Sequence, residues 1–430
     1  MPRSAVLLFS ILIPILEFST PIRASQIDSM DPDLRPGVVL GFDQALDEMT
    51  KKHSTVLVQK TQTNIAGQRV LEKKYGFLPT ISVGGSQSSA SLGSPSVNSI
   101  SATANINLFR AGADFSAVSA ASYDKEAEES TLEDKTLAAE TESAEVLVTD
   151  ISKRLQTEVL AKSVQTFQTG FDIAQQRYNK SILPLQEVDK LSVDLDNAMA
   201  RLRDAQEQAN TADANLVRLL GHEHIRFEWP WKKRLQSEAV RSLIQKEIPL
   251  TNRPDYKAAL AQTQAEAKRT SQSYRTIFPS LDLSVSEGTS QYLGQSYSGL
   301  SGTVGLSMPL FNGLHDYAEY GIQLENQSAS EIRLRQLERD IKSSAKAAQK
   351  NLEIALTTAL AREKTLETSQ RLYRANELRL KQGRASANEL AVDQTRLNDS
   401  ELLALQGWSD AHLAFVNLCH AFGRRVKDCD

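Results

Sequence analysis

The sequence predicts a fold that combines very long helices with a transmembrane β-barrel, to which each chain contributes four strands. Three observations support this prediction. The chain contains two internal repeats at a nearly constant offset. Each repeat holds two segments in which apolar and polar residues alternate, and each then continues into helical stretches much longer than a compact domain accommodates. We expect the strands to form a barrel and the coiled-coil helices an α-barrel, both closed as a trimer.

The two repeats are related by offsets of 200 and 202 positions. Pro79 and Pro279 correspond at an offset of 200, and Phe109 and Phe311, Arg177 and Arg379, and Glu187 and Glu389 correspond at an offset of 202. We therefore divide the chain into a first repeat (25–221), a connector (222–253) that we expect in an equatorial region, a second repeat (254–423) and a C-terminal tail (424–430). Each repeat comprises a lead-in helix, two strands and a helical hairpin.

The first 24 residues have the pattern of a secretory signal peptide. Arg3 precedes an apolar run from Ala5 to Leu16, and Ala24 ends the segment. A run of twelve residues is too short to cross a hydrocarbon core of ~30 Å as a helix. We expect export with cleavage after Ala24. Export permits Cys419 and Cys429 to pair, although the sequence leaves a disulfide and two free thiols equally open.

Each repeat starts with a helical lead-in, 42–74 in the first and 254–275 in the second, followed by two alternating segments. From Ile100 to Leu108, Ile, Ala and Leu alternate with Ser, Thr and Asn, and the same pattern recurs at 81–83, 281–286 and 300–308. This is the period of a strand with one apolar and one polar face. We expect external loops at 86–99 and 287–298.

The length of these strands suits a membrane barrel. About ten residues tilted by ~40° span ~25 Å, the height of an outer-membrane apolar band. A soluble sheet with one covered face would show the same alternation. Four strands cannot close a barrel, since the smallest barrels need about eight. The barrel interpretation therefore requires oligomerisation, and three chains would supply twelve strands.

The strands are followed by long helical hairpins. No proline or glycine lies between Gly112 and Gly170, which predicts a helix that continues to Asn179 and is ~105 Å long. In the arm that follows, apolar residues recur at spacings of three and four, as in a coiled coil. We expect the two hairpins to turn at 179–184 and 381–386, far from the strands. We call these turns the hairpin tips.

With these features the chain resembles the outer membrane efflux protein family. The resemblance covers about 42–423 and is carried by Pro309-Leu310-Phe311-Asn312-Gly313, by Arg253-Pro254-Asp255, and by the pattern Gly383-x-x-Ser386-x-x-Glu389-Leu390. It implies a homotrimer in the cell outer membrane that extends into the periplasm and contacts outer-membrane lipid. It also implies a passive exit duct of a tripartite efflux or type I secretion system, which docks to a periplasmic adaptor and an inner-membrane pump.

Candidate functional residues lie at and near the hairpin tips. The candidates for adaptor docking are Ser181, Pro184, Gly383 and Ser386. Three-fold symmetry would turn acidic residues beyond the tips into rings, and the resemblance implies a closed constriction there. The candidates for this constriction are Arg177, Glu187, Arg379, Glu389 and Asp393, with the arginines pairing to the acids in the closed state. A solvated, charged helix face is the alternative explanation.

The two repeats also differ. The first tip has Ser181 and Pro184 where the second has Gly383 and Ser386, and Asn107 stands where the second repeat has Pro309. The first tip is therefore expected to contact its adaptor differently, or to contact a different adaptor.

The sequence contains few groups that suggest chemistry. A net charge of −4 without a basic run excludes a nucleic-acid partner. The cluster His222-Glu223-His224 lacks the spacing of a helical zinc motif, and no phosphate-binding loop or nucleophile motif is present. We therefore expect no enzyme activity, no metal and no cofactor. The alternative class is a periplasmic coiled-coil adaptor or structural protein that bridges membranes, but adaptors have one hairpin and this chain has two.

Overall fold

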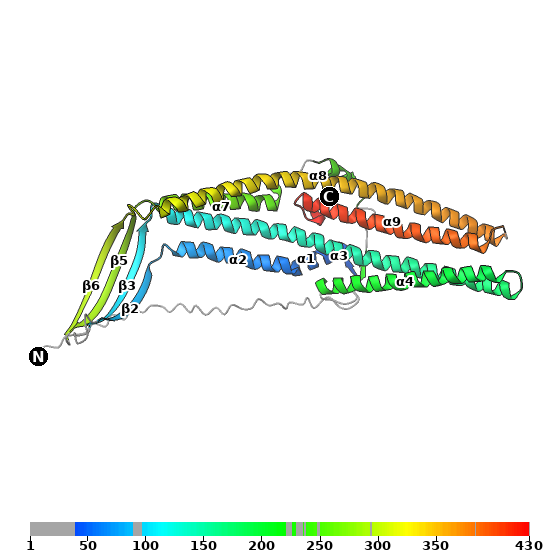
Figure 1. Ribbon diagram of the computed structural model, residues 1–430, viewed down its shortest axis with the longest axis horizontal. Coiled ribbons are helices and arrows are strands. Elements are labelled where there is room, and N and C mark those ends of the chain that lie inside the picture. Colours follow the sequence, from blue (N-terminus) through cyan, green and yellow to red (C-terminus); the bar gives the residue numbers. More distant parts are fainter. Residues whose placement is uncertain are drawn as a thin grey trace.

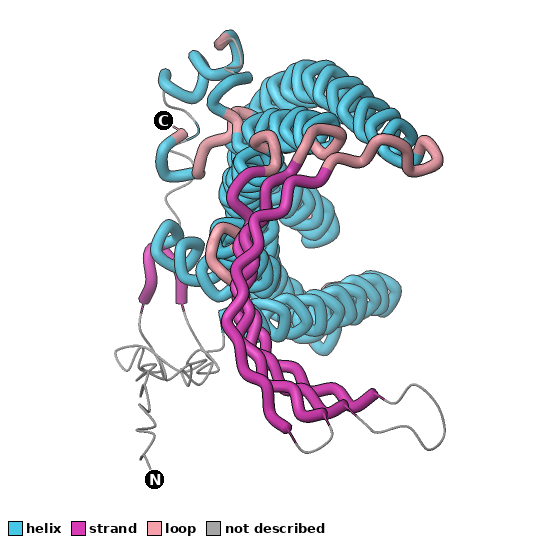
Figure 2. Tube along the Cα trace, turned by 90° about the vertical axis from the view of Figure 1, so that its left-hand side faces the viewer, coloured by secondary structure: helices cyan, strands magenta, loops and turns pink. Residues whose placement is uncertain are grey.

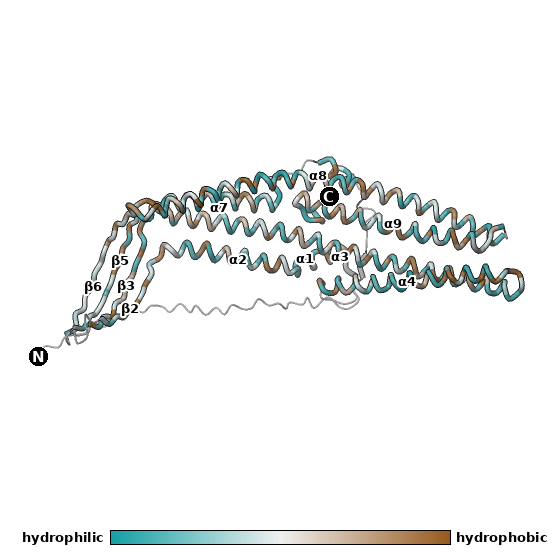
Figure 3. Tube along the Cα trace, in the orientation of Figure 1, coloured by the Kyte–Doolittle hydropathy of each residue, from teal (hydrophilic) through white to brown (hydrophobic). Residues whose placement is uncertain are grey.

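The protein is a long rod of helices with a four-stranded sheet at one end (Figure 1). The computed structural model describes residues 39–88, 97–220, 226–228, 235, 238–246, 250–292, 295–382 and 384–429. The predicted signal peptide, the His222-Glu223-His224 cluster and Gly383 lie outside the described residues. None of the described helices combines the length and the apolar character needed to cross a membrane. Figure 3 accordingly shows hydrophilic and hydrophobic residues interspersed along every long helix.

The four predicted strands are present and form one antiparallel sheet. They are β2 (Thr80–Ser88), β3 (Val97–Phe109), β5 (Ser280–Tyr292) and β6 (Gln295–Ser307), in the order β2-β3-β5-β6. The predicted loops were too long, because residues 287–292 pair with residues 295–300. In this part of the sheet Ser, Thr and Gln occupy both faces, so side-chain alternation fades although the backbone hydrogen bonds continue.

The register gathers the apolar side chains on one face of the sheet. Rows that cross the strands on this face include Ile81, Ala104, Val285 and Gly302, and next to it Ile106, Leu283 and Val304. The side chains stay open to solvent in the single chain, where Ile81 is 72% and Val304 is 65% exposed. The other face carries hydroxyl groups, for example those of Thr103 and Ser286, whose oxygens lie 3.2 Å apart.

The long helices continue the order of the strands. Next to the sheet, α2 (Ser54–Tyr75), α3 (Ala113–Asn179), α7 (Pro254–Arg275) and α8 (His315–Lys381) pack side by side in that order. Farther along the rod, α4 (Leu185–Leu220) packs on α3, and α9 (Ala387–Ala421) packs between α3 and α8. Both α3 and α8 have 67 residues, and they confirm the predicted long helices and both predicted turns.

The first lead-in is broken, which the sequence did not predict. Instead of one helix, the chain forms α1 (Phe42–Lys52) and α2, separated by His53 in an extended conformation with φ −61° and ψ 129°. The buried His53 ring lies 2.7 Å from the Thr55 hydroxyl and 3.3 Å from the Glu142 carboxylate. Beyond this break, α1 packs against both α3 and α4.

An equatorial region packs against one side of the rod near its middle (Figure 2). It contains β1 (Val39–Gly41), which pairs in parallel with β4 (Arg226–Glu228), and it contains the short helix α6 (Glu238–Gln245) of the connector. The C-terminal residues also pack here, with a short helix η2 (Val426–Asp428) and a disulfide between Cys419 and Cys429. The buried side chains of this core include Phe42, Leu46, Met49, Leu147, Leu216, Val240, Leu352, Phe415, Phe422 and Val426.

An ion cluster ties the C-terminal residues to α1 and α3. Arg425 lies 2.5 Å from a carboxylate oxygen of Asp47 and 3.3 Å from one of Glu140. The backbone N–H of Val426 also donates to Glu140, at 3.3 Å. Burial raises the pKa of Glu140 although the neighbouring Arg425 acts to lower it.

This raised pKa predicts a specific pH dependence of stability. The folded protein binds the Glu140 proton more tightly than the unfolded chain, whose pKa is near 4.5. The contribution of Glu140 to stability is therefore greatest below that value and is lost as the pH rises through the folded-state pKa. Glu140→Gln abolishes this titration, so the Tm of the variant is expected to change less than that of the wild type as the pH rises above the unfolded-state value near 4.5. An equal change in both proteins would contradict this, and the exposed Glu72→Gln is the matched control.

Candidate functional site at the hairpin tips

The first hairpin tip is a tight turn closed by backbone hydrogen bonds. After α3 ends at Asn179, the N–H of Ile182 donates to the carbonyl of Arg177 at 2.9 Å. Ser181 takes the left-handed conformation with φ 56°. This is the arrangement of a helix C-terminal cap that usually holds glycine, and a residue with a Cβ costs about 1 kcal/mol there.

The second tip has the same closing bond at an offset of 202. The N–H of Arg384 donates to the carbonyl of Arg379 at 2.8 Å. Ser386 then caps α9, because its hydroxyl accepts from the N–H of Glu389 at 3.1 Å. At the corresponding position of the first tip stands Pro184, whose carbonyl accepts from the N–H of Glu187 at 3.1 Å. The two tips therefore differ in how the helix after the turn begins, and a different adaptor contact stays a prediction.

The tips also present different chemistry. The first tip exposes apolar side chains, with Ile182 68% and Leu185 52% exposed, and an open pocket of about 710 Å³ lies within it. This pocket is lined by Tyr178, Asn179, Ser181, Ile182, Leu183 and Pro184. The second tip exposes the cations Arg379, Lys381 and Arg384, at positions where the first tip has Arg177, Asn179 and Ile182.

Among the constriction candidates, the structure links Arg379 to Asp393 through a third residue. The amide of Asn376 donates to the buried carboxylate of Asp393, and Arg379 donates to the amide oxygen of Asn376 at 3.1 Å. Arg396 adds an ion pair to Asp393 at 2.8 Å. The sequence analysis missed Asn376, since only the fold of the hairpin shows that α8 and α9 bring it opposite Asp393.

The other candidates lie apart from one another within one chain. Glu187 pairs with Lys190 at 3.1 Å, while Arg177 and Glu389 are exposed. In the part of the chain that the structure describes, no direct ion pair joins Arg177 or Arg379 to the three acidic candidates. Direct pairing of these arginines to the acids therefore requires other copies or another conformation.

The helices form an arc with a concave inner face, seen end-on in Figure 2. The equatorial core packs on one side of α3, through residues such as Ala144 and Leu147. Residues about half a helical turn away, such as Asp124 and Gln156, line the concave side. There Arg201 of α4 pairs with Asp399 of α9 at 3.5 Å across α3.

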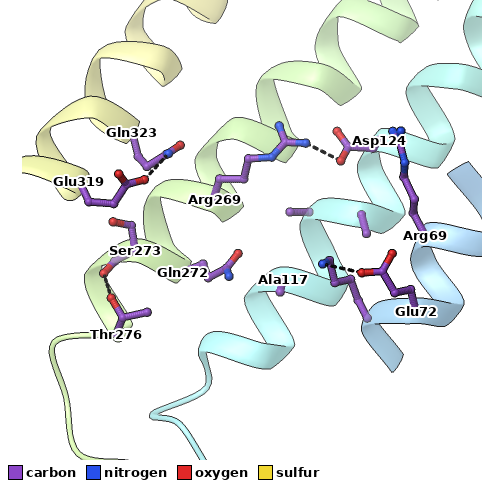
Figure 4. A pocket seen from close by; sticks show the side chains of 13 residues that line it. Arg69, Glu72, Ala117, Asp124, Arg269, Gln272, Ser273, Thr276, Glu319 and Gln323 are labelled. Carbon is purple, nitrogen blue, oxygen red and sulfur yellow. Dashed lines mark hydrogen bonds and ion pairs between the residues drawn. The ribbon is translucent and has the colours of Figure 1, made fainter. Parts of the chain in front are cut away.

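A pocket on the inner face, close to the sheet, shows which side chains line this face. It has a volume of about 490 Å³ and is lined by all four helices next to the strands. In Figure 4, Arg269 of α7 points to Asp124 of α3, and their side chains lie 2.5 Å apart. Most of the pocket's lining residues carry charged or amide side chains, several of which pair with one another, and three are alanines. It therefore resembles the lining of a water-filled passage more than a binding site for one ligand.

Known structures share this architecture. CusC matches with a TM-score of 0.77 and 14% identity over 89% of this chain and 92% of the CusC chain. The CmeC outer membrane channel of Campylobacter jejuni matches with a TM-score of 0.75 and 12% identity over 89% of this chain and 85% of the CmeC chain. The open state of the MtrE channel of Neisseria gonorrhoeae matches with a TM-score of 0.74 and 16% identity over 89% of this chain and 88% of the MtrE chain. At these identities the similarity establishes the fold. No curated protein sequence matches the chain.

A family model provides the stronger evidence. The model of the outer membrane efflux protein matches residues 46–222 and 247–424. These two segments cover most of the chain and coincide with the two repeats, which are built from corresponding helices and strands. The chain therefore belongs to the outer membrane efflux protein family.

Proposed function

We propose that the protein is one subunit of a homotrimeric exit duct, which receives cargo from an inner-membrane pump through a periplasmic adaptor. As a family member, it is an efflux channel of the outer membrane that extends into the periplasm. The observation that supports closure by several copies is the sheet itself. Both edge strands, β2 and β6, are exposed along their whole length, and so is most of the apolar face. A bilayer does not tolerate an unpaired sheet edge, and three copies would supply a barrel of twelve strands.

The decisive experiment measures location and mass together. The protein is recovered from a density-separated outer-membrane fraction in mild detergent, and its mass is determined by light scattering with correction for detergent. A mass of about three chains in that fraction supports the duct. A monomer in the soluble periplasmic fraction would contradict it and would favour a periplasmic coiled-coil adaptor or structural protein.

The hairpin tips are the proposed docking surface for the adaptor. They lie at the end of the rod opposite the sheet (Figure 1), so they face the inner membrane when the sheet is in the outer membrane. The residues proposed for contact are Ser181, Pro184, Gly383 and Ser386. The polar inner wall suits a range of small exported compounds, and export of polypeptides by a type I system is the second candidate cargo route.

The closed state of the duct is proposed to depend on the charged residues near the tips, namely Arg177, Glu187, Arg379, Glu389 and Asp393. Glu389→Ala or Arg379→Ala is expected to weaken closure and to increase the entry of antibiotics or dyes, because a ring of charges loses its partners. The measurement is uptake of a fluorescent dye in cells that produce equal amounts of each variant. Glu367→Ala, exposed on the same helix as Arg379, is the control. Dye uptake equal to that of the control would contradict a role of Glu389 and Arg379 in closing the duct.

A further inference from the structure

We infer that the outward side of the rod, at the level of the equatorial region, binds the anionic polymer of the cell wall, peptidoglycan. The binding surface is a row of cations on α8 together with two cations in and directly after α6. We call this surface the cationic stripe. It consists of Arg241, Lys246, Arg335, Arg339, Lys342, Lys346 and Lys350, all of which are exposed. The inference rests on the proposed function, because it takes the rod to cross the periplasm from a sheet in the outer membrane.

The α8 part of the stripe is a single line of side chains along one side of the helix. Its five cations, from Arg335 to Lys350, follow one another at intervals of four, three, four and four positions. Residues with this spacing project from the same side of a helix. Ile341, Ala345 and Leu352 show the same kind of spacing and are buried, so the stripe runs beside the face of α8 that packs against the rest of the protein.

Helix α6 widens the stripe. The Gln349 amide of α8 donates to the carbonyls of Leu243 and Lys246, at 3.2 and 2.9 Å, and thereby holds the C-terminal end of α6 against α8. Lys346 lies one helical turn before Gln349, and Arg241 lies on α6 itself. The fold thus gathers cations from two segments that are about a hundred positions apart in the sequence, and the stripe does not show as a basic run.

The first repeat shows that the fold does not require cations on this side of the helix. At the offset of 202, the cations Arg339, Lys342, Lys346 and Lys350 correspond to Leu137, Glu140, Ala144 and Val148, all of which are buried. The same side of α3 is therefore covered by the chain's own residues, while that of α8 presents positive charge to the solvent.

The chain itself neutralises little of this charge. Among the described residues, Lys350 is the one cation of the stripe that forms an ion pair, with Glu353 at 2.9 Å. Acidic side chains flank the stripe, with Glu331 before it, Glu353 after it and Glu238 at the start of α6. Like charges four positions apart on a helix repel one another. An anionic partner would relieve this repulsion.

The position of the stripe narrows the choice of partner. Ala144, the equivalent of Lys346, packs in the equatorial core, and Figure 2 shows the equatorial region on the side of the arc opposite its concave face. Arg335 and Lys350 lie about 30 and 50 Å along α8 from its start near the sheet, and the second hairpin tip, at Lys381, lies about 45 Å beyond Lys350. Since charges are screened over ~8 Å at physiological salt, neither the lipid headgroups at the sheet nor an adaptor at the tips reaches the stripe.

Peptidoglycan fits the stripe by position and by charge. It forms a layer between the two membranes, and its peptide stems carry free carboxylates. An ammonium group is a point charge on a flexible stem, which suits carboxylates at variable positions. Single exposed ion pairs are weak, but a trimer carries three stripes, and binding at one stripe raises the effective concentration of carboxylates at the others. Binding is therefore expected to depend on salt and on several lysines together.

The test is co-sedimentation of the full-length protein, purified in mild detergent, with isolated peptidoglycan sacculi. The wild type is expected to sediment at low salt and to be released as the salt concentration rises. The variant that combines Lys342→Gln, Lys346→Gln and Lys350→Gln is expected to lower the sedimented fraction by about fivefold or more, because each of the three stripes of a trimer is weakened.

Two controls separate the stripe from general charge. The variant that combines Lys364→Gln, Arg371→Gln and Arg374→Gln removes the same charge from exposed positions of the same helix, nearer the tips, and is expected to sediment like the wild type. Sacculi whose carboxylates have been converted to amides are expected to retain little of the wild type.

Equal sedimentation of the wild type and the stripe variant would overturn the inference, as would equal binding to native and amidated sacculi. Stronger binding to vesicles of anionic phospholipid than to sacculi would also overturn it, because the partner would then be a lipid. The mass of each protein in detergent is measured in parallel. A trimeric wild type that does not sediment would overturn the inference and leave the exit duct intact, whereas a monomeric wild type would contradict the exit duct itself.

Discussion

Replacing Val304 with arginine is expected to destabilise the assembled sheet in the membrane by about 2–4 kcal/mol, the cost of a cation near the middle of the lipid-facing band of a barrel. Val304 lies on the apolar face, opposite Leu283, and is 65% exposed in the single chain. On that face its row lies between the row of Leu281 with Leu306 and the row of Val285 with Gly302, so we expect it inside the apolar band. Fewer trimers in the outer membrane, and a lower temperature at which they dissociate in detergent, are the expected results.

The neighbouring residue provides the control for this prediction. Thr303 lies opposite Ser284 on the hydroxyl-lined face, where an arginine would reach the water of the passage. Thr303→Arg is therefore expected to assemble almost normally. Equal losses in the two variants would show that the apolar face does not contact lipid, and the membrane placement of the sheet would then be wrong.

Most of the fold could be predicted because its periods are long and uninterrupted. The alternation of apolar and polar residues from Ile100 to Leu108 predicts a strand. The absence of proline and glycine over most of its length predicts α3. The break at His53 could not be predicted, because no proline or glycine marks it. It depends on a buried ring that contacts Glu142, a residue almost ninety positions away. The pairing of β1 with β4 was missed for a similar reason, since each strand has only three residues.

The candidate site was predictable in position and not in its contacts. The turn at Ser181 follows from the repeat, which places it where the second tip has Gly383. The link from Arg379 through Asn376 to Asp393 depends on how α8 and α9 pack, and sequence spacing alone does not reveal it. Rings of Glu389 or Asp393 depend on other copies of the chain, so their role stays a prediction.

The removal of the disulfide by Cys419→Ser with Cys429→Ser is expected to destabilise the equatorial region by about 2–3 kcal/mol, because the bond closes a loop with a sequence separation of 10. The sequence left this bond open, and the structure forms it with Cα atoms 5.7 Å apart. The measurement is the free energy of unfolding in denaturant. It is followed by tryptophan fluorescence, to which Trp408, buried in the same core, contributes.

Loss of the disulfide is expected to affect more than the closed loop, because the bond helps to hold Arg425 where it pairs with both Asp47 and Glu140. Without it, the ordering of residues 424–429 must come from burial of Val426 and from the ion cluster alone. A reducing agent provides the internal control: it should destabilise the wild type by the same amount and leave the double variant unchanged. If the reducing agent destabilised both proteins equally, its effect would not arise from this bond. Equal unfolding free energies of the oxidised wild type and the double variant would show that the ion cluster and the apolar core hold the C-terminal residues by themselves.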